Sequence, residues 1–72
     1  MEDKAATTAD AIELILLNQH AIRAAIEELS LWVSQRGSTT THDNVMTALQ
    51  TIDINTGEIN KLIICLRQEN GE

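Results

Sequence analysis

Apolar residues recur at alternating spacings of three and four along the first half of the chain. One such stripe is interrupted only by Gln19. Its apolar members are Ile12, Ile15, Ile22, Ile26, Leu29 and Val33. This is the heptad periodicity of an α-helix with one apolar side. We therefore predict a first helix over about residues 10–36.

Residues at both ends of this segment favour those limits. Thr7 with Asp10 resembles a capping box, in which a side-chain oxygen accepts a backbone N–H of the first turn. Residues 1–9 are therefore predicted to form a flexible N-terminal tail. Gly37 suits the left-handed conformation that commonly ends a helix, and the polar residues after it favour a turn over residues 37–41.

The second half repeats the pattern, with Thr56 as the polar member of the stripe. The apolar members are Val45, Leu49, Ile52, Ile59, Ile63 and Leu66. We predict a second helix over about residues 42–69, followed by a short tail over 70–72.

Residues 51–59 also fit a second interpretation. Ile52 and Ile54 alternate with polar residues, and the following Asn-Thr-Gly is typical of a tight turn between strands. We favour a continuous helix because the heptad keeps its phase on both sides of Gly57. In a helix, Gly57 would indicate a bend or a close backbone contact.

A short turn between two helices places them side by side in opposite directions. The predicted fold is all-α, a two-helix antiparallel hairpin over residues 10–69. In this arrangement Val33 lies opposite Val45 and Ile12 opposite Leu66. Gln19 and Thr56 then occupy adjacent layers near the middle of the hairpin.

One seam between two helices leaves other apolar residues uncovered. Those outside it include Leu14, Leu17, Ala21, Ala24, Leu31, Trp32, Met46 and Ile54. Chains below ~70–80 residues rarely gain enough stability from one small core. We predict that these residues bind a second copy or a partner protein, and that two hairpins form a four-helix bundle. The pattern leaves the topology of this homodimer open.

Charge and composition narrow the function classes. The 72 residues include 11 acidic and 5 basic residues, giving a net charge of -6, which disfavours nucleic acid as a partner. No apolar run approaches the ~18 residues of a membrane span, so no membrane partner is expected. The polar start lacks the features of a secretory signal, and Cys65 is the single cysteine. These features favour a cytoplasmic protein.

No catalytic or metal-binding motif is recognised. His20 and His42 fall on different helices, and no His, Cys, Asp or Glu cluster has the spacing of a zinc site. Phosphate-binding glycine loops and nucleophile motifs are absent from the sequence. We predict a non-enzymatic protein with no catalytic residue, metal or cofactor.

Trp32, the single aromatic residue, has two interpretations. It either fills the turn end of the core or anchors a partner protein. The predicted function is a protein–protein interaction module that binds and modulates or inhibits a partner. The alternative is a hairpin chaperone or antitoxin-like subunit of a hetero-complex. In size and layout the hairpin also resembles Rop-like plasmid copy-number regulators, dimers of helical hairpins that bind paired RNA loops, but no shared motif transfers a residue role.

Overall fold

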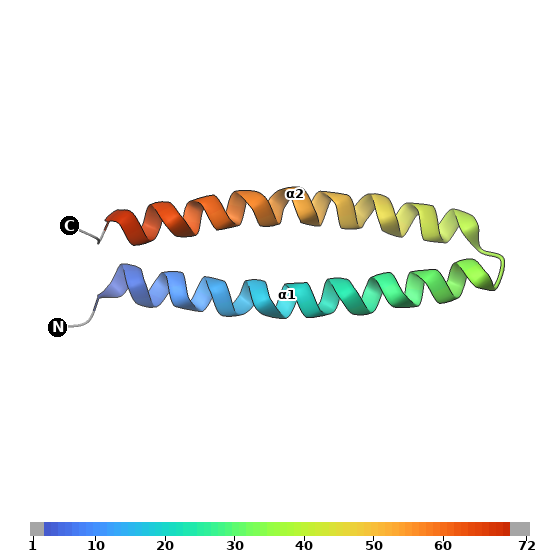
Figure 1. Cartoon of the computed structure of the whole chain (residues 1–72), viewed down its shortest axis with the longest axis horizontal. Helices are drawn as coiled ribbons and strands as arrows, with labels where there is room; N and C mark the ends of the chain where they lie inside the picture. Colours follow the sequence, from blue (N-terminus) through green and yellow to red (C-terminus); the bar gives the residue numbers. More distant parts are fainter. Residues whose placement is uncertain (1–2, 70–72) are drawn as a thin grey trace.

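The computed structural model describes residues 3–69, which form two helices joined by a short turn. Helix α1 spans Lys4–Gln35 and helix α2 spans Thr39–Glu69. The helices run side by side in opposite directions, so α1 begins where α2 ends (Figure 1). The Cα atoms extend over 56 × 17 × 9 Å. The predicted all-α, two-helix antiparallel hairpin is confirmed.

Helix α1 begins at Lys4, six residues before the predicted start. Asp3 is its N-cap, and the Asp3 carboxylate accepts a hydrogen bond from the Ala6 backbone N–H at 3.1 Å. Alanine, the strongest helix former, occupies positions 5, 6 and 9. The prediction of a flexible tail over residues 1–9 is therefore wrong for Lys4–Ala9. Residues 1–2 and the predicted tail over 70–72 lie outside the described residues.

The turn between the helices closes on Gly37. Its φ of 99° is left-handed, the conformation that glycine adopts without a steric penalty. The Ser38 N–H donates to the Val33 carbonyl at 3.2 Å, and the Gly37 N–H donates to the Ser34 carbonyl at 2.9 Å. This pair of bonds is a Schellman motif, which satisfies carbonyls at the end of α1. Because α2 already begins at Thr39, the connection is shorter than the predicted turn over 37–41.

Helix α2 runs without a break through residues 51–59, so the alternative of a strand and a tight turn is wrong. Gly57 is exposed, and a Cβ placed there would meet no atom within 4 Å. The glycine therefore makes no close backbone contact within the hairpin.

The seam between the helices holds a small core. Ala9, Leu16, Leu49 and Ile63 are buried, with at most 6% of their surface exposed. The α2 stripe faces α1 along its length, because its remaining apolar members are half-buried: Val45, Ile52, Ile59 and Leu66.

Helix α1 differs from the prediction. Ile12 and Val33 are half-buried, and Ile26 is 37% exposed. Three predicted seam residues instead face solvent, each at least 58% exposed: Ile15, Ile22 and Leu29. Their places in the seam are taken by the residues that follow them: Leu16, Arg23 and Ser30. The prediction that Ile15, Ile22 and Leu29 lie in the seam of one hairpin is therefore wrong. Helix α1 is rotated about its axis so that Arg23 meets Asp53 and Ser30 meets His42 on α2.

Candidate interaction surfaces

One side of the hairpin carries ion pairs that cross from α1 to α2. At mid-length, Arg23 donates from Nε to Oδ1 of Asp53 at 2.6 Å and from Nη2 to Oδ2 at 2.8 Å. Its Nη1 donates to Glu27 at 2.9 Å. These bonds to Arg23 lower the pKa of the Asp53 carboxyl below its ordinary value.

A second cluster lies on the same side near the start of α1. Arg67 donates from Nη2 to Asp10 at 2.8 Å and also to the Glu13 carboxylate. The hydrogen bond to Asp10, and to a smaller extent the one to Glu13, raises the pKa of the Arg67 guanidinium. We call this side the ionic face, made of Asp10, Glu13, Arg23, Glu27, Asp53 and Arg67. Its charges are satisfied within the chain.

A polar pair closes the seam near the turn. Ser30 is 4% exposed, and its hydroxyl oxygen lies 2.8 Å from Nδ1 of His42, which is half-buried. A buried hydroxyl needs such a partner, so the pair fixes where this end of α1 faces α2. The sequence identified His42 but gave no sign of its partner, because Ser30 lies outside the apolar stripe.

The opposite broad side of the hairpin is mainly apolar. A groove there is lined by residues from both helices, Ile12 from α1 and Ile59, Leu62, Ile63, Cys65 and Leu66 from α2. The neutral face is defined by the two heptad positions of each helix that continue this groove, over residues 12–33 of α1 and 45–66 of α2. Ile63, which is buried in the seam, and Cys65, which borders the groove from the outer side of α2, are not part of it. Its residues are Ile12, Ile15, Gln19, Ile22, Ile26, Leu29, Val33, Val45, Ala48, Ile52, Asn55, Ile59, Leu62 and Leu66.

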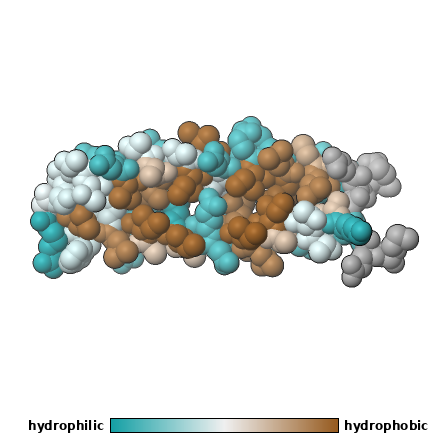
Figure 2. All heavy atoms as spheres, turned by 180° about the vertical axis from the view of Figure 1, so that it is seen from behind, coloured by the Kyte–Doolittle hydropathy of each residue, from teal (hydrophilic) through white to brown (hydrophobic). Residues whose placement is uncertain are grey.

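No member of the neutral face is charged, and two are polar, Gln19 and Asn55. Both lie near the middle of their helices, and we call them the polar belt. Figure 2 shows the face turned away in Figure 1, where apolar side chains run along both helices and are interrupted by polar ones near mid-length. The predicted seam residues of α1 that the hairpin leaves exposed, such as Ile22, belong to this face.

Helix α1 carries a further exposed apolar stripe, next to the ionic face. We call it the outer stripe, and its residues are Leu14, Leu17, Ala21, Ala24 and Leu31. The spacings are again three and four, apart from Glu28, which occupies one position between Ala24 and Leu31. The leucine side chains are 49–64% exposed. Leu14 and Leu17 also border a groove of about 490 Å³ next to Asp10 and Glu13.

Trp32 lies on the surface beside the outer stripe and is 53% exposed. The Arg36 guanidinium stacks over its ring, 4.6 Å from the centroid, in a cation–π contact. Trp32 therefore does not fill the core of a single hairpin. Its two interpretations, as part of the core of a four-helix bundle or as an anchor for a partner, remain predictions.

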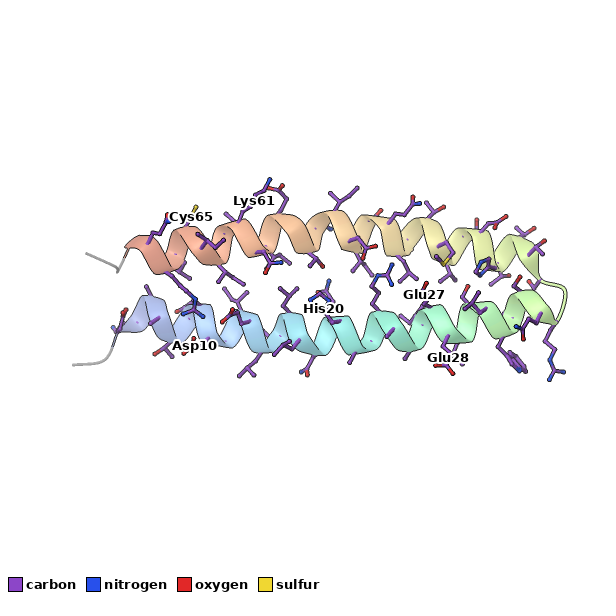
Figure 3. The ribbon with its side chains drawn as sticks, viewed as in Figure 1. Asp10, His20, Glu27, Glu28, Lys61 and Cys65 are labelled. Carbon is purple, nitrogen blue, oxygen red and sulfur yellow. The ribbon has the colours of Figure 1, made fainter. Side chains whose placement is uncertain are left out.

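The other predicted binding residues are separated from these surfaces. Met46 is half-buried and Ile54 is 69% exposed on the outer side of α2. Figure 3 shows Lys61 and Cys65 also pointing away from α1, and His20 and Glu27 on the side of α1 that faces α2, with Glu28 opposite. The structure therefore does not bring all eight predicted binding residues onto one surface.

Within residues 3–69, no group of three His, Cys, Asp or Glu side chains is placed to hold a metal ion. In the same part of the chain, neither helix has a stretch that is long and apolar enough to cross a membrane. The features that remain to be explained are the uncovered apolar surfaces of the two helices. No protein-family model, curated protein or solved structure matches this chain significantly.

Proposed function

We propose that this chain is a non-enzymatic protein–protein interaction module, a homodimeric helical hairpin that binds a partner protein and modulates or inhibits it. The observation that carries the proposal is the outer stripe of α1. Its leucines make no seam with α2 and expose about half or more of their surface. A contiguous apolar strip on a small protein is costly in water and marks a binding surface.

The spacing of the outer stripe suits a helix of the partner. An amphipathic helix docks through residues at three- and four-residue spacing, which the stripe matches along α1. Ala21 and Ala24 lie in its middle, and their small side chains allow a second helix to approach closely. Trp32, exposed at the turn end, is the residue type most often found as an interface anchor.

The charge distribution favours a partner with a basic surface. The net charge is -6, and most of the basic side chains are already engaged. Arg23, Arg67 and Lys61 pair with carboxylates, and Arg36 stacks on Trp32. Little cationic surface is left for a phosphate backbone, which supports a protein rather than a nucleic acid as the partner.

We also propose that the module acts in the cytoplasm. Cys65 is an exposed free thiol and the chain has no second cysteine with which to pair. Such a thiol persists most readily in a reducing compartment. Fluorescence microscopy of the tagged chain in its own cells would test this, and an extracytoplasmic signal would overturn it.

An affinity pull-down from the lysate of the encoding organism tests the binding proposal. The tagged chain is compared with Leu17→Glu, on the outer stripe, and with Ile54→Glu, on the outer side of α2. A protein recovered in stoichiometric amount with the wild type and Ile54→Glu, and lost with Leu17→Glu, is the expected result. Recovery of no protein, or equal recovery with both variants, would overturn the outer stripe as the binding surface.

A further inference from the structure

We infer that the neutral face binds a second copy of this chain, and that the two hairpins lie antiparallel, with their turns at opposite ends of a four-helix bundle. The inference rests on the homodimer of the proposed function and specifies its surface and its symmetry axis. It does not depend on partner binding by the outer stripe, which lies on a different side of α1.

The surface area of the hairpin shows how much is left to cover. The chain of 7.9 kDa exposes 5503 Å², whereas a compact monomer of this mass exposes about 4,400 Å². The excess, on the order of 1,000 Å², is comparable to one partner's share, about 800 Å², of a standard protein interface. The broad side of the hairpin, 56 by 17 Å between Cα atoms, is large enough to supply it.

Chemistry identifies the neutral face as the side that a second copy covers. Two chains that each carry a charge of -6 repel one another unless their acidic groups stay apart. On the ionic face the carboxylates of Asp10, Glu13 and Asp53 would approach those of the second copy. The neutral face contains no charged residue, so two copies can join there without desolvating a carboxylate.

The exposure pattern of α1 has the geometry of a four-helix bundle. In a two-helix coiled coil the apolar stripe of each helix points at its partner, whereas in a four-helix bundle it points between two neighbours. The apolar stripe of α1 points partly away from α2, as it does in a four-helix bundle. Ile12 and Ile26 flank the seam, and Ile15 and Ile22 turn toward the neutral face, where they are 64% and 58% exposed.

The polar belt locates the symmetry axis. Gln19 and Asn55 lie close to the midpoints of α1 and α2. An axis through the belt and perpendicular to the helices brings the four polar side chains of two copies together and superposes apolar halves on apolar halves. On α1 the two halves match, since isoleucines stand seven residues before and after Gln19, at positions 12 and 26. In the antiparallel arrangement the polar residues of two copies meet only if they lie at the middle of the helices. In a parallel arrangement they would meet at any height along the helices, so a central position would not be required.

The oligomeric state of the full chain gives the first test. We expect a mass of twice 7.9 kDa at micromolar concentration by sedimentation equilibrium. Ile22→Glu is expected to raise the dimer dissociation constant at least ~100-fold, because the symmetry places two unpaired carboxylates in the interface. Ile54→Glu is the matched control, an isoleucine of similar exposure away from the neutral face, and should remain dimeric. A monomeric wild type, or equal dimerisation of both variants, would overturn the inference.

Cys65, which borders the groove of the neutral face from α2, tests the antiparallel axis without any substitution in the chain. It is the only cysteine, it is exposed, and it lies toward the end of α2, so a nitroxide label attaches at one place per chain. In the antiparallel dimer the two labels lie on opposite sides of the belt. At 1.5 Å per residue their axial separation is about 30 Å. A dipolar spectrum centred below about 20 Å, or a disulfide that forms on air oxidation within one dimer and leaves its native mass unchanged, would indicate parallel hairpins and overturn this axis.

The two proposals fail separately. Loss of dimerisation with Ile22→Glu, while the pull-down partner of the outer stripe is retained, would support both surfaces as assigned. A dimeric wild type that recovers no partner would overturn the proposed binding function and leave the dimer standing. A chain that stays monomeric alone and joins a different protein through Ile22 would overturn the dimer in favour of a hetero-complex.

Discussion

Arg23 and Asp53 lie 30 residues apart in the chain and join the two helices through two parallel hydrogen bonds of 2.6 and 2.8 Å. The planar guanidinium matches both carboxylate oxygens at once, a geometry with more directional specificity than a single contact. The pair therefore fixes the rotation of α1 about its own axis at mid-length. This rotation directs Ile22, one residue before Arg23, to the neutral face.

The Asp53 pair predicts a defined pH dependence of stability. Hydrogen bonds from Arg23 lower the pKa of folded Asp53 below its ordinary 3.8, so the folded state binds this proton more weakly than the unfolded state. The stabilisation is therefore present above pH 3.8 and is lost as the pH falls through the lowered value. We expect the wild type to melt at a higher temperature than Asp53→Asn at pH 7, and the difference to disappear in strong acid.

Thermal unfolding followed by circular dichroism at constant ionic strength would measure this difference. Glu58→Gln is the control, since Glu58 pairs with Lys61 on the same helix at an exposed site, where ion pairs contribute little. A difference between wild type and Asp53→Asn that stays constant between pH 7 and pH 2 would contradict the prediction.

The two described glycines should respond in opposite directions to alanine. Gly57 lies within α2, and a Cβ added there would have no atom within 4 Å, so Gly57→Ala should stabilise the protein by about 0.5–1 kcal/mol. Gly37 has a φ of 99°, and Gly37→Ala should cost about 1–2 kcal/mol. Urea unfolding at one fixed protein concentration would show both effects. Destabilisation by Gly57→Ala would mean that a further chain approaches α2 at this position.

The sequence predicted both helices and the α2 seam because each follows from one clear periodicity. Every large apolar member of the α2 stripe is buried or half-buried, and polar residues occupy most other positions of that helix. Heptad phase was also the correct guide through Gly57, where local composition alone would have fitted a strand and turn. When a helix has a single dominant apolar stripe, that stripe decides which side of the helix packs against its neighbour.

The rotation of α1 was not predictable from apolar spacing, because that helix is apolar on several sides. The stripe through Ile15 and Ile22 and the outer stripe through Leu14 and Leu17 compete for burial, and one neighbouring helix covers neither completely. The choice is made by polar partners on α2 that come together only after folding. Arg23 meets Asp53 and Ser30 meets His42 across the seam.

The start of α1 could have been found from the sequence. Asp3 is a preferred N-cap residue and precedes alanines at positions 5 and 6, which are strong helix formers. The pair Thr7 and Asp10 offers a competing start, which stands closer to the first isoleucine of the stripe. In the structure the Thr7 N–H donates to the Asp3 carbonyl within the first turn.

The Ser30 and His42 pair predicts coupled effects on stability. Ser30→Ala removes the hydroxyl 2.8 Å from Nδ1 of His42 and leaves a half-buried polar atom without its partner, at a cost of about 1 kcal/mol. Adding His42→Leu replaces both polar groups with apolar ones and should recover most of that loss. A double-mutant cycle by urea unfolding measures the coupling. Additive effects of the two substitutions would show that the contact does not stabilise the hairpin.

Trp32 and Leu49 should differ sharply on truncation to alanine. Leu49 is 1% exposed at the seam, and Leu49→Ala should cost about 2–5 kcal/mol through lost burial and the cavity left behind. Trp32 is 53% exposed, and its clear contact is the stacked Arg36, so Trp32→Ala should cost about 1 kcal/mol or less. Unfolding followed by circular dichroism compares the two without relying on tryptophan fluorescence.

The fluorescence of the wild type provides an independent check on this assignment. An exposed indole emits at long wavelength and is readily quenched by acrylamide, and both properties should persist in the antiparallel dimer if Trp32 lies outside its interface. Emission that shifts to shorter wavelength as the protein concentration rises would place Trp32 at the contact between copies. If Trp32→Ala then unfolded as readily as Leu49→Ala, Trp32 would belong to the core of the assembly. A small stability effect together with loss of the pull-down partner would instead assign it to partner binding.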